Sequence, residues 1–221
     1  MTRTNIKFCG ITTIDDYIFI SDQEDVNFIG LIFTDKSPRC LNIMNANKIL
    51  NSTSKQKSIV GVFMDQSESY IQNIIDNVHL DILQFHGNET LDFCKRFDKP
   101  FIKTLHINDK LLDFNLDFQK YINHFLIDTT FNNMHGGTGK SFNWKLLSND
   151  PTISNLIKKN PCFIAGGLDA DNIGDLISTY KPHGVDVSSG LESSVGKKDH
   201  LLMKKFLENV RISEKDHNEK N

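Results

Sequence analysis

The chain has 221 residues, enough for one domain with a sizeable core. Its formal net charge of −3 and its pI of about 6.2 provide no basic surface for nucleic acid or for an anionic membrane. The first residues, MTRTNIKFCG, lack the apolar core of a signal peptide, and no apolar run approaches the roughly 20 residues that span a bilayer, so we expect a cytoplasmic protein.

Short apolar segments rich in β-branched residues recur along the chain, each bounded by polar or turn residues. They are nearly continuous in apolar residues, which is typical of parallel strands buried on both faces of a sheet. We predict strands at 5–10, 28–33, 58–64, 81–87, 101–107, 124–129, 161–167 and 184–190.

Segments with the apolar spacing of helices lie between these strands, for example 68–78, 170–180 and 199–210. Alternating strands and helices imply right-handed crossovers between parallel strands. Eight such units predict an α/β protein whose single domain, residues 1–210, is a (β/α)₈ TIM barrel. The polar residues 211–221 are expected to form a disordered tail. A doubly wound open sheet is the alternative, but it usually has fewer strands, and no Gly-x-Gly-x-x-Gly follows the first strand.

The spacing of cysteine and histidine gives no sign of a disulfide or a metal site. The four cysteines are scattered without a Cys-x-x-Cys pair, so free thiols in a reducing compartment are the simpler interpretation. The eight histidines show neither His-x-x-x-His nor His-Glu-x-x-His spacing, and we expect no protein-bound metal.

Five of the eight predicted strands end in residues that core packing alone does not explain. Each end by itself has a structural explanation, such as a turn or a buried thiol. In a TIM barrel, however, chemistry is located at the carboxyl ends of the strands, and all five lie there. These ends are Cys9-Gly10, His86-Gly87, Asp128-Thr129, Gly166-Gly167 and Ser188-Ser189-Gly190.

The last two of these ends predict a phosphate site, because barrel enzymes commonly bind phosphate with the loops after strands seven and eight. Gly166 and Gly167 allow close approach of the backbone, and Ser188, Ser189 and Gly190 offer N–H groups and two hydroxyls. The alternative for the glycine pair is a simple strand-to-helix turn. We expect a small-molecule substrate that carries a phosphate monoester.

A thiol and a carboxyl at opposite sides of a barrel opening can serve as base and acid on one substrate. Cys9 and Asp128 are placed in this way by their strands. Cys9 has the alternative of being buried filler, whereas an unpaired Asp128 would be costly to bury. Arg39, in DKSPRC after strand two, can hold a substrate carboxylate or be a solvated loop residue, and His86 can bind substrate or cap a turn.

The stretch HGGTGKSFNW at 135–144 contains a GKS that resembles the end of a P-loop. The first glycine of that motif falls on Met134, so the required spacing is absent. Because this loop follows the strand of Asp128, we interpret Gly136, Gly137 and Gly139 as hinges of an active-site lid. We expect Phe142 and Trp144 to attach the end of this lid to the core.

Taken together and in this order, the motifs resemble those of the N-(5′-phosphoribosyl)anthranilate isomerase family of tryptophan biosynthesis. The resemblance extends from residue 7 to residue 200. One departure is Asn143, where the family usually has Asp. The matching motifs are KFCGIT (7–12), GLIFTDKSPR (30–39), VGVF (60–63), LQFHG (83–87), LIDT (126–129), GGTGKSFNW (136–144), AGGL (165–168) and GVDVSSGLE (184–192).

The resemblance implies an Amadori rearrangement of an aminoaldose phosphate, with no metal or organic cofactor. It implies Cys9 as the general base, Asp128 as the general acid and Arg39 as the residue that holds the anthranilate carboxylate. His86 and Asp186 are implied to lie around the substrate, and Gly166, Gly167, Ser188, Ser189 and Gly190 to bind its phosphate. The protein is expected to be a monomer or a homodimer.

Two other functions remain possible for such a barrel. A synthase or lyase would favour a catalytic lysine at a strand end, and Lys7 and Lys103 are the strand lysines nearest that description, although the sequence identifies no carboxylate partner for either. A barrel that only binds a sugar phosphate is the second alternative.

Overall fold

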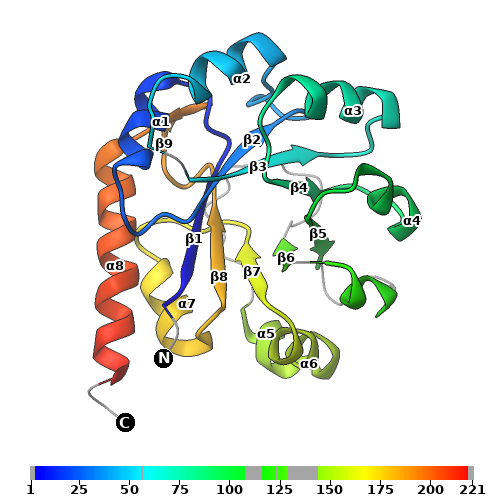
Figure 1. Ribbon diagram of the computed structural model, residues 1–221. Coiled ribbons are helices and arrows are strands. Elements are labelled where there is room, and N and C mark those ends of the chain that lie inside the picture. Colours follow the sequence, from blue (N-terminus) through cyan, green and yellow to red (C-terminus); the bar gives the residue numbers. More distant parts are fainter. Residues whose placement is uncertain (1–2, 56, 108–115, 123, 129–143, 219–221) are drawn as a thin grey trace.

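The computed structural model describes residues 3–55, 57–107, 116–122, 124–128 and 144–218, and eight strands among them form a closed barrel (Figure 1). Consecutive strands pair in parallel, and the last strand closes onto the first. The predicted (β/α)₈ barrel is therefore confirmed. The strands are β1 (Asn5–Cys9), β2 (Phe28–Ile32), β3 (Ser58–Phe63), β4 (Ile82–Phe85), β5 (Phe101–His106), β6 (His124–Asp128), β7 (Cys162–Ala165) and β8 (Gly184–Val187).

Helices follow the strands and surround the barrel. Five of them begin at a Thr, Asn, Ser or Asp whose side chain accepts a hydrogen bond from a backbone N–H of the first turn, namely α1, α2, α3, α4 and α6. The helices are α1 (Ile14–Ser21), α2 (Ile43–Leu50), α3 (Glu68–Asn77), α4 (Leu91–Cys94), α5 (Lys145–Asn149), α6 (Pro151–Lys159), α7 (Ile173–Tyr180) and α8 (His200–Asn218), with short 3₁₀ turns η1 (Lys95–Phe97) and η2 (Leu116–Lys120).

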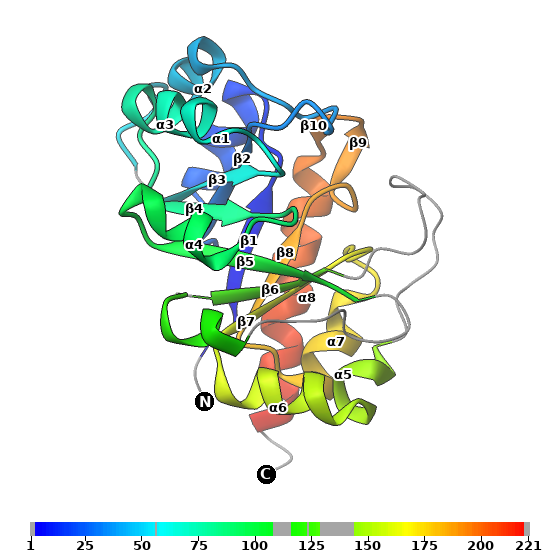
Figure 2. The same cartoon turned by 90° about the vertical axis from the view of Figure 1, so that its right-hand side faces the viewer.

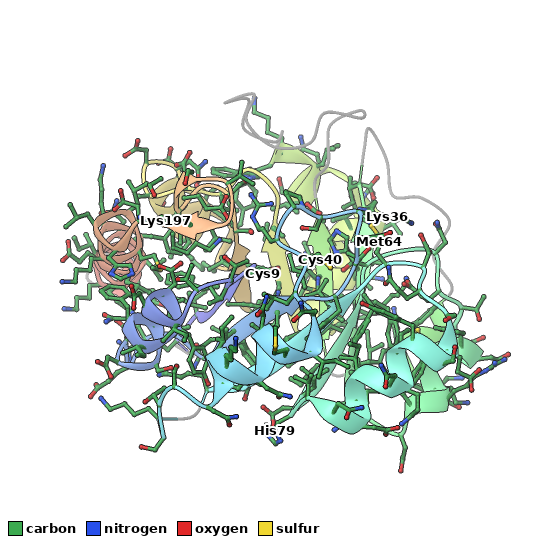
Figure 3. All side chains as sticks on the ribbon, turned by 90° about the horizontal axis from the view of Figure 1, so that it is seen from above. Cys9, Lys36, Cys40, Met64, His79 and Lys197 are labelled. Carbon is green, nitrogen blue, oxygen red and sulfur yellow. The ribbon has the colours of Figure 1, made fainter. Side chains whose placement is uncertain are left out.

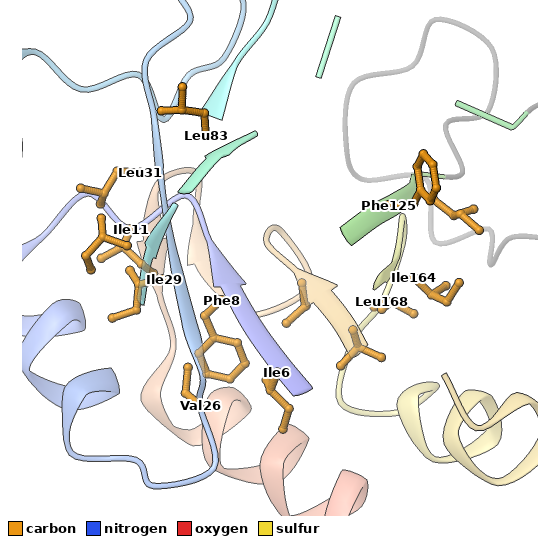
Figure 4. Close-up of a cluster of buried hydrophobic side chains, with 14 of the residues drawn as sticks. Ile6, Phe8, Ile11, Val26, Ile29, Leu31, Leu83, Phe125, Ile164 and Leu168 are labelled. Atoms are coloured by element: carbon orange, nitrogen blue, oxygen red, sulfur yellow. The ribbon is translucent and has the colours of Figure 1, made fainter. Parts of the chain in front are cut away.

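The buried side chains divide between the outside and the inside of the barrel, because successive side chains of a strand point to opposite faces; a third, small cluster is formed by Cys9, Ile32 and Val62. The larger part fills the space between strands and helices, and Figure 4 shows some of its members, among them Phe8 of β1. Phe8 packs edge-on against Phe206 of α8, with ring centroids 5.9 Å apart. The smaller part fills the inside of the barrel. Its buried members are Val60, Ile82, Ile102, Leu126, Phe163 and Ala165.

The structure differs from the sequence-based expectation at residue 211, where a disordered tail was predicted to begin. Helix α8 instead continues to Asn218. Arg211 binds Asp25 at 3.0 Å and Glu214 at 2.8 Å, and Glu214 also accepts a hydrogen bond from the backbone N–H of Thr4. These charged residues are polar in sequence but attach the helix to the start of the barrel, which composition alone could not reveal.

A short antiparallel hairpin, β9 (Glu192–Ser194) and β10 (Lys197–Lys198), follows β8 and was not predicted. In Figure 2 it lies on the right-hand side, toward which the arrowheads of the barrel strands point. The carboxyl ends of the strands lie on this side, and we call it the mouth of the barrel. None of the helices in the described part of the chain is both long and apolar enough to cross a membrane.

Candidate active site

Cys9 lies at the carboxyl end of β1, inside the barrel. It packs with Ile32 and Val62, and only 6% of its surface is exposed. In Figure 3, which shows the molecule from above relative to Figure 1, Cys9 is near the middle of the picture, with Lys197 and Cys40 on either side of it. The thiol is therefore placed at the inner wall of the mouth, as the sequence predicted.

Beneath Cys9, a fully buried lysine pairs with a carboxylate. Lys7 of β1 and Asp186 of β8 occupy paired positions in the sheet, and Lys7 Nζ lies 2.9 Å from Asp186 Oδ2. Burial raises the pKa of the Cys9 thiol, and the nearby Lys7 ammonium opposes part of that rise. The other carboxylate oxygen, Asp186 Oδ1, is buried and has no hydrogen-bond partner among the described residues. An acceptor left in this way is suited to a hydroxyl of a bound substrate.

A second polar group is formed by the ends of β4, β5 and β6. His86 Nε2, just after β4, lies 3.2 Å from Asp128 Oδ2 at the end of β6. His106, at the end of β5, is paired in register with Asp128, and its Nε2 lies 2.7 Å from the carbonyl oxygen of His86. Asp128 is thus surrounded by two imidazole rings, whose centroids are 4.9 Å apart.

The ring of His86 is held from below by two buried side chains. Its Nδ1 lies 3.0 Å from the hydroxyl of Thr104 and 3.2 Å from Gln84 Nε2, which itself donates to Thr104 at 3.3 Å. In the tautomer in which Nδ1 accepts the Gln84 amide N–H, the Nε2 nitrogen carries the proton and donates to Asp128. The contact between His86 Nε2 and Asp128 Oδ2 therefore orients the Asp128 carboxyl group.

The same three residues come closest to a metal site among the described residues. One potential ligand atom from each of His86, His106 and Asp128 lies within 4.8 Å of the others. Both nitrogens of His86 and the Nε2 of His106 already have protein partners. A metal ion would have to displace these hydrogen bonds, so the geometry favours a hydrogen-bonded acid over a metal centre.

Arg39, in the loop after β2, was expected to be available to a substrate carboxylate. The structure pairs it with Glu192 of β9: Arg39 Nε lies 2.5 Å from Oε1 and Nη2 lies 2.6 Å from Oε2. Lys198 of β10 binds the same carboxylate at 2.9 Å. Although burial alone would raise the pKa of Glu192, these two cations lower it to about 2. Arg39 is therefore partly neutralised and held in place.

The residues predicted to bind phosphate come together in the loops after β7 and β8. Gly166 and Gly167 have φ values of 91° and 63°, in the left-handed region that glycine enters without a steric penalty. An isolated parallel bridge joins Asp169 to Gly190, so the two loops lie side by side. The hydroxyl of Ser188 is buried and has no partner among the described residues. A buried hydroxyl without a partner is suited to binding an anion.

The predicted hinges Gly136, Gly137 and Gly139 lie outside the described residues, as do Phe142 and Asn143. The lid therefore remains a prediction. Trp144, at its far end, packs against the main core, and α5 begins at the next residue, as expected.

Comparison with known sequences and structures identifies the family of this barrel. The sequence profile described as N-(5′-phosphoribosyl)anthranilate (PRA) isomerase matches residues 6–209. The chain belongs to this family. It is an isomerase of tryptophan biosynthesis, as the sequence motifs predicted.

Individual PRA isomerases match over nearly their whole length. The enzyme of Legionella pneumophila strain Paris is 37% identical over 215 residues, which make up 95% of this chain and 98% of the relative. The solved structure from Thermotoga maritima superposes with a TM-score of 0.80 at 28% identity, covering 94% of this chain and 98% of that one. A further PRA isomerase structure, in complex with reduced 1-(o-carboxyphenylamino)-1-deoxyribulose 5-phosphate, has a TM-score of 0.76 at 27% identity, with the same coverage.

Sequence reasoning on this PRA isomerase chain missed three features of the site. The segment around His106 was not recognised, although His106 ends a predicted strand just as His86 and Asp128 do. Glu192 was included in a motif but given no role. The sequence identifies no carboxylate partner for Lys7 or Lys103, whereas the structure pairs them with Asp186 and Glu89 at 2.9 and 3.0 Å. Lys7 and Asp186 are 179 residues apart and meet where the barrel closes, whereas Lys103 and Glu89 are 14 residues apart and meet through the neighbouring strands β4 and β5.

Proposed function

We propose that this enzyme converts N-(5′-phosphoribosyl)anthranilate into 1-(o-carboxyphenylamino)-1-deoxyribulose 5-phosphate, with Asp128 as general acid and Cys9 as general base. The observation that carries the proposal is the position of these two groups. They end β6 and β1, which are separated by β7 and β8 on one side and by β2 to β5 on the other. A ribose lying across the mouth can therefore meet an acid on one side and a base on the other.

The first step opens the furanose ring. Asp128 donates its proton to the ring oxygen as the C1′–O4′ bond breaks, and the lone pair of the anthranilate nitrogen forms the C1′=N bond of an iminium ion. His86 Nε2, 3.2 Å from Asp128 Oδ2, supports this step because its N–H stabilises the carboxylate that is left behind.

The second step moves the hydrogen that interconverts aldose and ketose. The iminium acidifies the C2′–H bond, and the Cys9 thiolate takes that proton to give an enolamine. C1′ then takes up one proton and the C2′ hydroxyl loses one, which yields the aminoketose. Every hydrogen moves as a proton, and the proposal therefore includes no cofactor. The positive charge of the iminium also favours deprotonation of Cys9 in the bound complex.

Binding of the substrate is assigned to residues around these two groups. We assign its phosphate to Gly166, Gly167, Ser188, Ser189 and Gly190. The unpaired oxygen of Asp186 and the ring of His86 are assigned to the ribose, and Arg39 to the anthranilate carboxylate. The unpaired atoms Ser188 Oγ and Asp186 Oδ1 support this assignment, because each lacks a partner among the described residues. The proposal places the enzyme in the cytoplasm, as a monomer or a homodimer.

The proposal is tested with freshly prepared phosphoribosylanthranilate, whose fluorescence disappears as it is converted. Wild-type protein is expected to turn it over, and Cys9→Ser and Asp128→Asn are each expected to lose a factor of about 10² to 10⁴, the usual contribution of a general acid or base. The matched control is Cys40→Ser, which removes an exposed thiol near the mouth and should leave the rate unchanged.

Two results would contradict the proposal. Near-wild-type rates in Cys9→Ser or Asp128→Asn would remove the acid–base assignment. No conversion by folded wild-type protein that still binds the product analogue would favour a sugar-phosphate binder without catalysis.

A further inference from the structure

We propose that Glu192 is a positioning residue: it holds the Nε/Nη2 edge of the Arg39 guanidinium and thereby directs the adjacent Nη1/Nη2 edge to the carboxylate of the substrate. Glu192 would then determine the preference of the enzyme for a carboxylated aromatic amine. This inference rests on the role of Arg39 given under Proposed function and extends it to a residue on a different element.

The contact between the two side chains is a two-point pairing. The Nε–H and one Nη2–H of Arg39 meet the two oxygens of Glu192 at 2.5 and 2.6 Å. Such a pairing fixes the plane of the guanidinium, which a single hydrogen bond does not. Solvent screening is small here, because only 15% of the Arg39 side chain and 5% of the Glu192 side chain are exposed.

The pairing leaves a second binding edge. A guanidinium has five N–H donors, of which Glu192 takes two on the Nε side. The Nη1 group and the remaining Nη2 hydrogen form the end edge, and Nη1 has no hydrogen-bond partner among the described residues. The end edge can bind a carboxylate with the same two-point geometry. The Nε side of the Arg39 guanidinium is thus occupied by Glu192, and its end edge is left to bind a ligand.

Other contacts hold both members of the pair. Lys198 is almost fully buried, and its Nζ binds Glu192 at 2.9 Å and the carbonyl of Ser188 at 3.0 Å. The Cδ of Arg39 lies over Gly10, so close that a Cβ at that position would be 2.5 Å from it. The stem of Arg39 is therefore fixed against the loop after β1, next to Cys9, while its head is fixed by the hairpin.

Charge balance gives Glu192 a second effect. Without it, Arg39 and Lys198 would be two nearly buried cations sharing one region of the mouth, which is costly in a low dielectric. With it, the three groups have a net charge of +1, which is still attractive to a carboxylate. Burial lowers the pKa of Lys198 and Glu192 opposes that change, so the carboxylate also supports the charge of Lys198.

The experiment compares two substrates, phosphoribosylanthranilate and the otherwise identical phosphoribosylaniline, which lacks the carboxylate. The measured quantity is the ratio of kcat/KM for the two. This ratio should be high in the wild type and should fall to near one in Arg39→Met. Glu192→Gln should lower the ratio about tenfold or more, through a higher KM for phosphoribosylanthranilate, with kcat and the aniline substrate little affected.

The matched control is Glu68→Gln, which breaks a comparable but exposed pair with Arg96, 2.6 Å long, on the outer helices. It should leave the ratio unchanged. A general loss of structure would lower kcat/KM for both substrates together, so the ratio separates positioning from stability.

Should Glu192→Gln not fold, Arg39→Lys tests the same pairing by changing the other residue. Its ammonium has no second edge while paired with Glu192, so the ratio should fall to the Arg39→Met value.

The outcomes distinguish this inference from the function on which it rests. An unchanged ratio in Glu192→Gln, or in Arg39→Lys, with a collapsed ratio in Arg39→Met overturns the role of Glu192 and leaves that of Arg39 standing. An unchanged ratio in Arg39→Met overturns both roles, whereas the acid–base assignment to Cys9 and Asp128 is unaffected.

Discussion

Lys7 and Asp186 form an ion pair inside the barrel: the Nζ of Lys7 lies 2.9 Å from Asp186 Oδ2, and Lys7 is 0% exposed to solvent. Burial by itself would lower the pKa of Lys7, but the Asp186 carboxylate and the neighbouring Cys9 raise it by more, so the ammonium stays charged. The pair joins β1 to β8, where the barrel closes. It also supports Cys9 from below and leaves one oxygen of Asp186 for a ligand.

Replacing Lys7 with Met should destabilise the protein strongly, because it leaves the Asp186 carboxylate buried without its partner. The expected loss is about 3–5 kcal/mol of unfolding free energy, measured by urea denaturation at neutral pH. The double variant Lys7→Met with Asp186→Leu removes both charges and should recover most of that loss. If the double variant is no more stable than Lys7→Met, the loss comes from packing and not from the unpaired charge.

The pH dependence of catalysis should reveal the buried state of Cys9. The pH profile of kcat/KM reports on the free enzyme, in which burial raises the pKa of this thiol. We therefore expect kcat/KM to increase with pH and to level off only above the pKa of an ordinary thiol. The corresponding limb of kcat should lie at lower pH, because the cationic iminium in the bound complex favours the thiolate. A kcat/KM that is flat from about pH 6 to pH 8 would argue against Cys9 as the base.

The barrel could be predicted because it depends on local patterns. Runs of buried β-branched residues specify the strands, and the apolar spacing between them specifies the helices, within a few residues of sequence. The polar strand ends Cys9, His86 and Asp128 could be found for the same reason. Each of them is placed by its own strand, in which successive side chains point alternately to the two faces of the sheet.

The pairings within the site could not be predicted, because they depend on where separate strands meet. Glu192 follows Arg39 by 153 residues, and Lys7 and Asp186 are 179 apart. His106 becomes part of the site only because the register between β5 and β6 sets it level with Asp128. The continuation of α8 past residue 210 has the same origin, since Arg211 finds Asp25 across the fold.

Stability should fall in mild acid because of His124, at the start of β6. Burial, followed by the nearby His183, lowers the pKa of His124 from 6.5 to about 4. The native state therefore favours the neutral ring, and the stabilisation is present above pH 6.5 and is lost as the pH falls towards 4. The ring is partly exposed, so we expect about 1–2 kcal/mol between these limits, less than the full shift would give.

The measurement is the urea midpoint at neutral pH and near pH 4.5, for the wild type and for His124→Phe, which keeps a ring against Phe28 and Phe163. The variant should lose less stability on acidification than the wild type. The control His79→Asn removes a histidine that is 73% exposed and should behave like the wild type. Equal acid sensitivity in all three proteins would assign the effect to other groups.

Thr104 offers the sharpest test of how Asp128 is oriented. Its hydroxyl lies 3.0 Å from His86 Nδ1 and also receives the amide of Gln84, and it is 2% exposed. Thr104→Val keeps the shape of the side chain but removes the hydroxyl, so His86 loses one of its two fixed partners. We expect kcat to fall roughly tenfold with little change in KM, because Asp128 acts in the transition state more than in binding. Thr104→Ser retains the hydroxyl and should keep most of the rate. The ¹⁵N chemical shifts of the His86 ring give an independent readout: the wild type, Thr104→Ser and Thr104→Val should all show Nε2 protonated, because the Gln84 amide stays at Nδ1 in each of them. A wild-type ring protonated at Nδ1 would contradict this orientation of Asp128, as would equal rates in the Val and Ser variants.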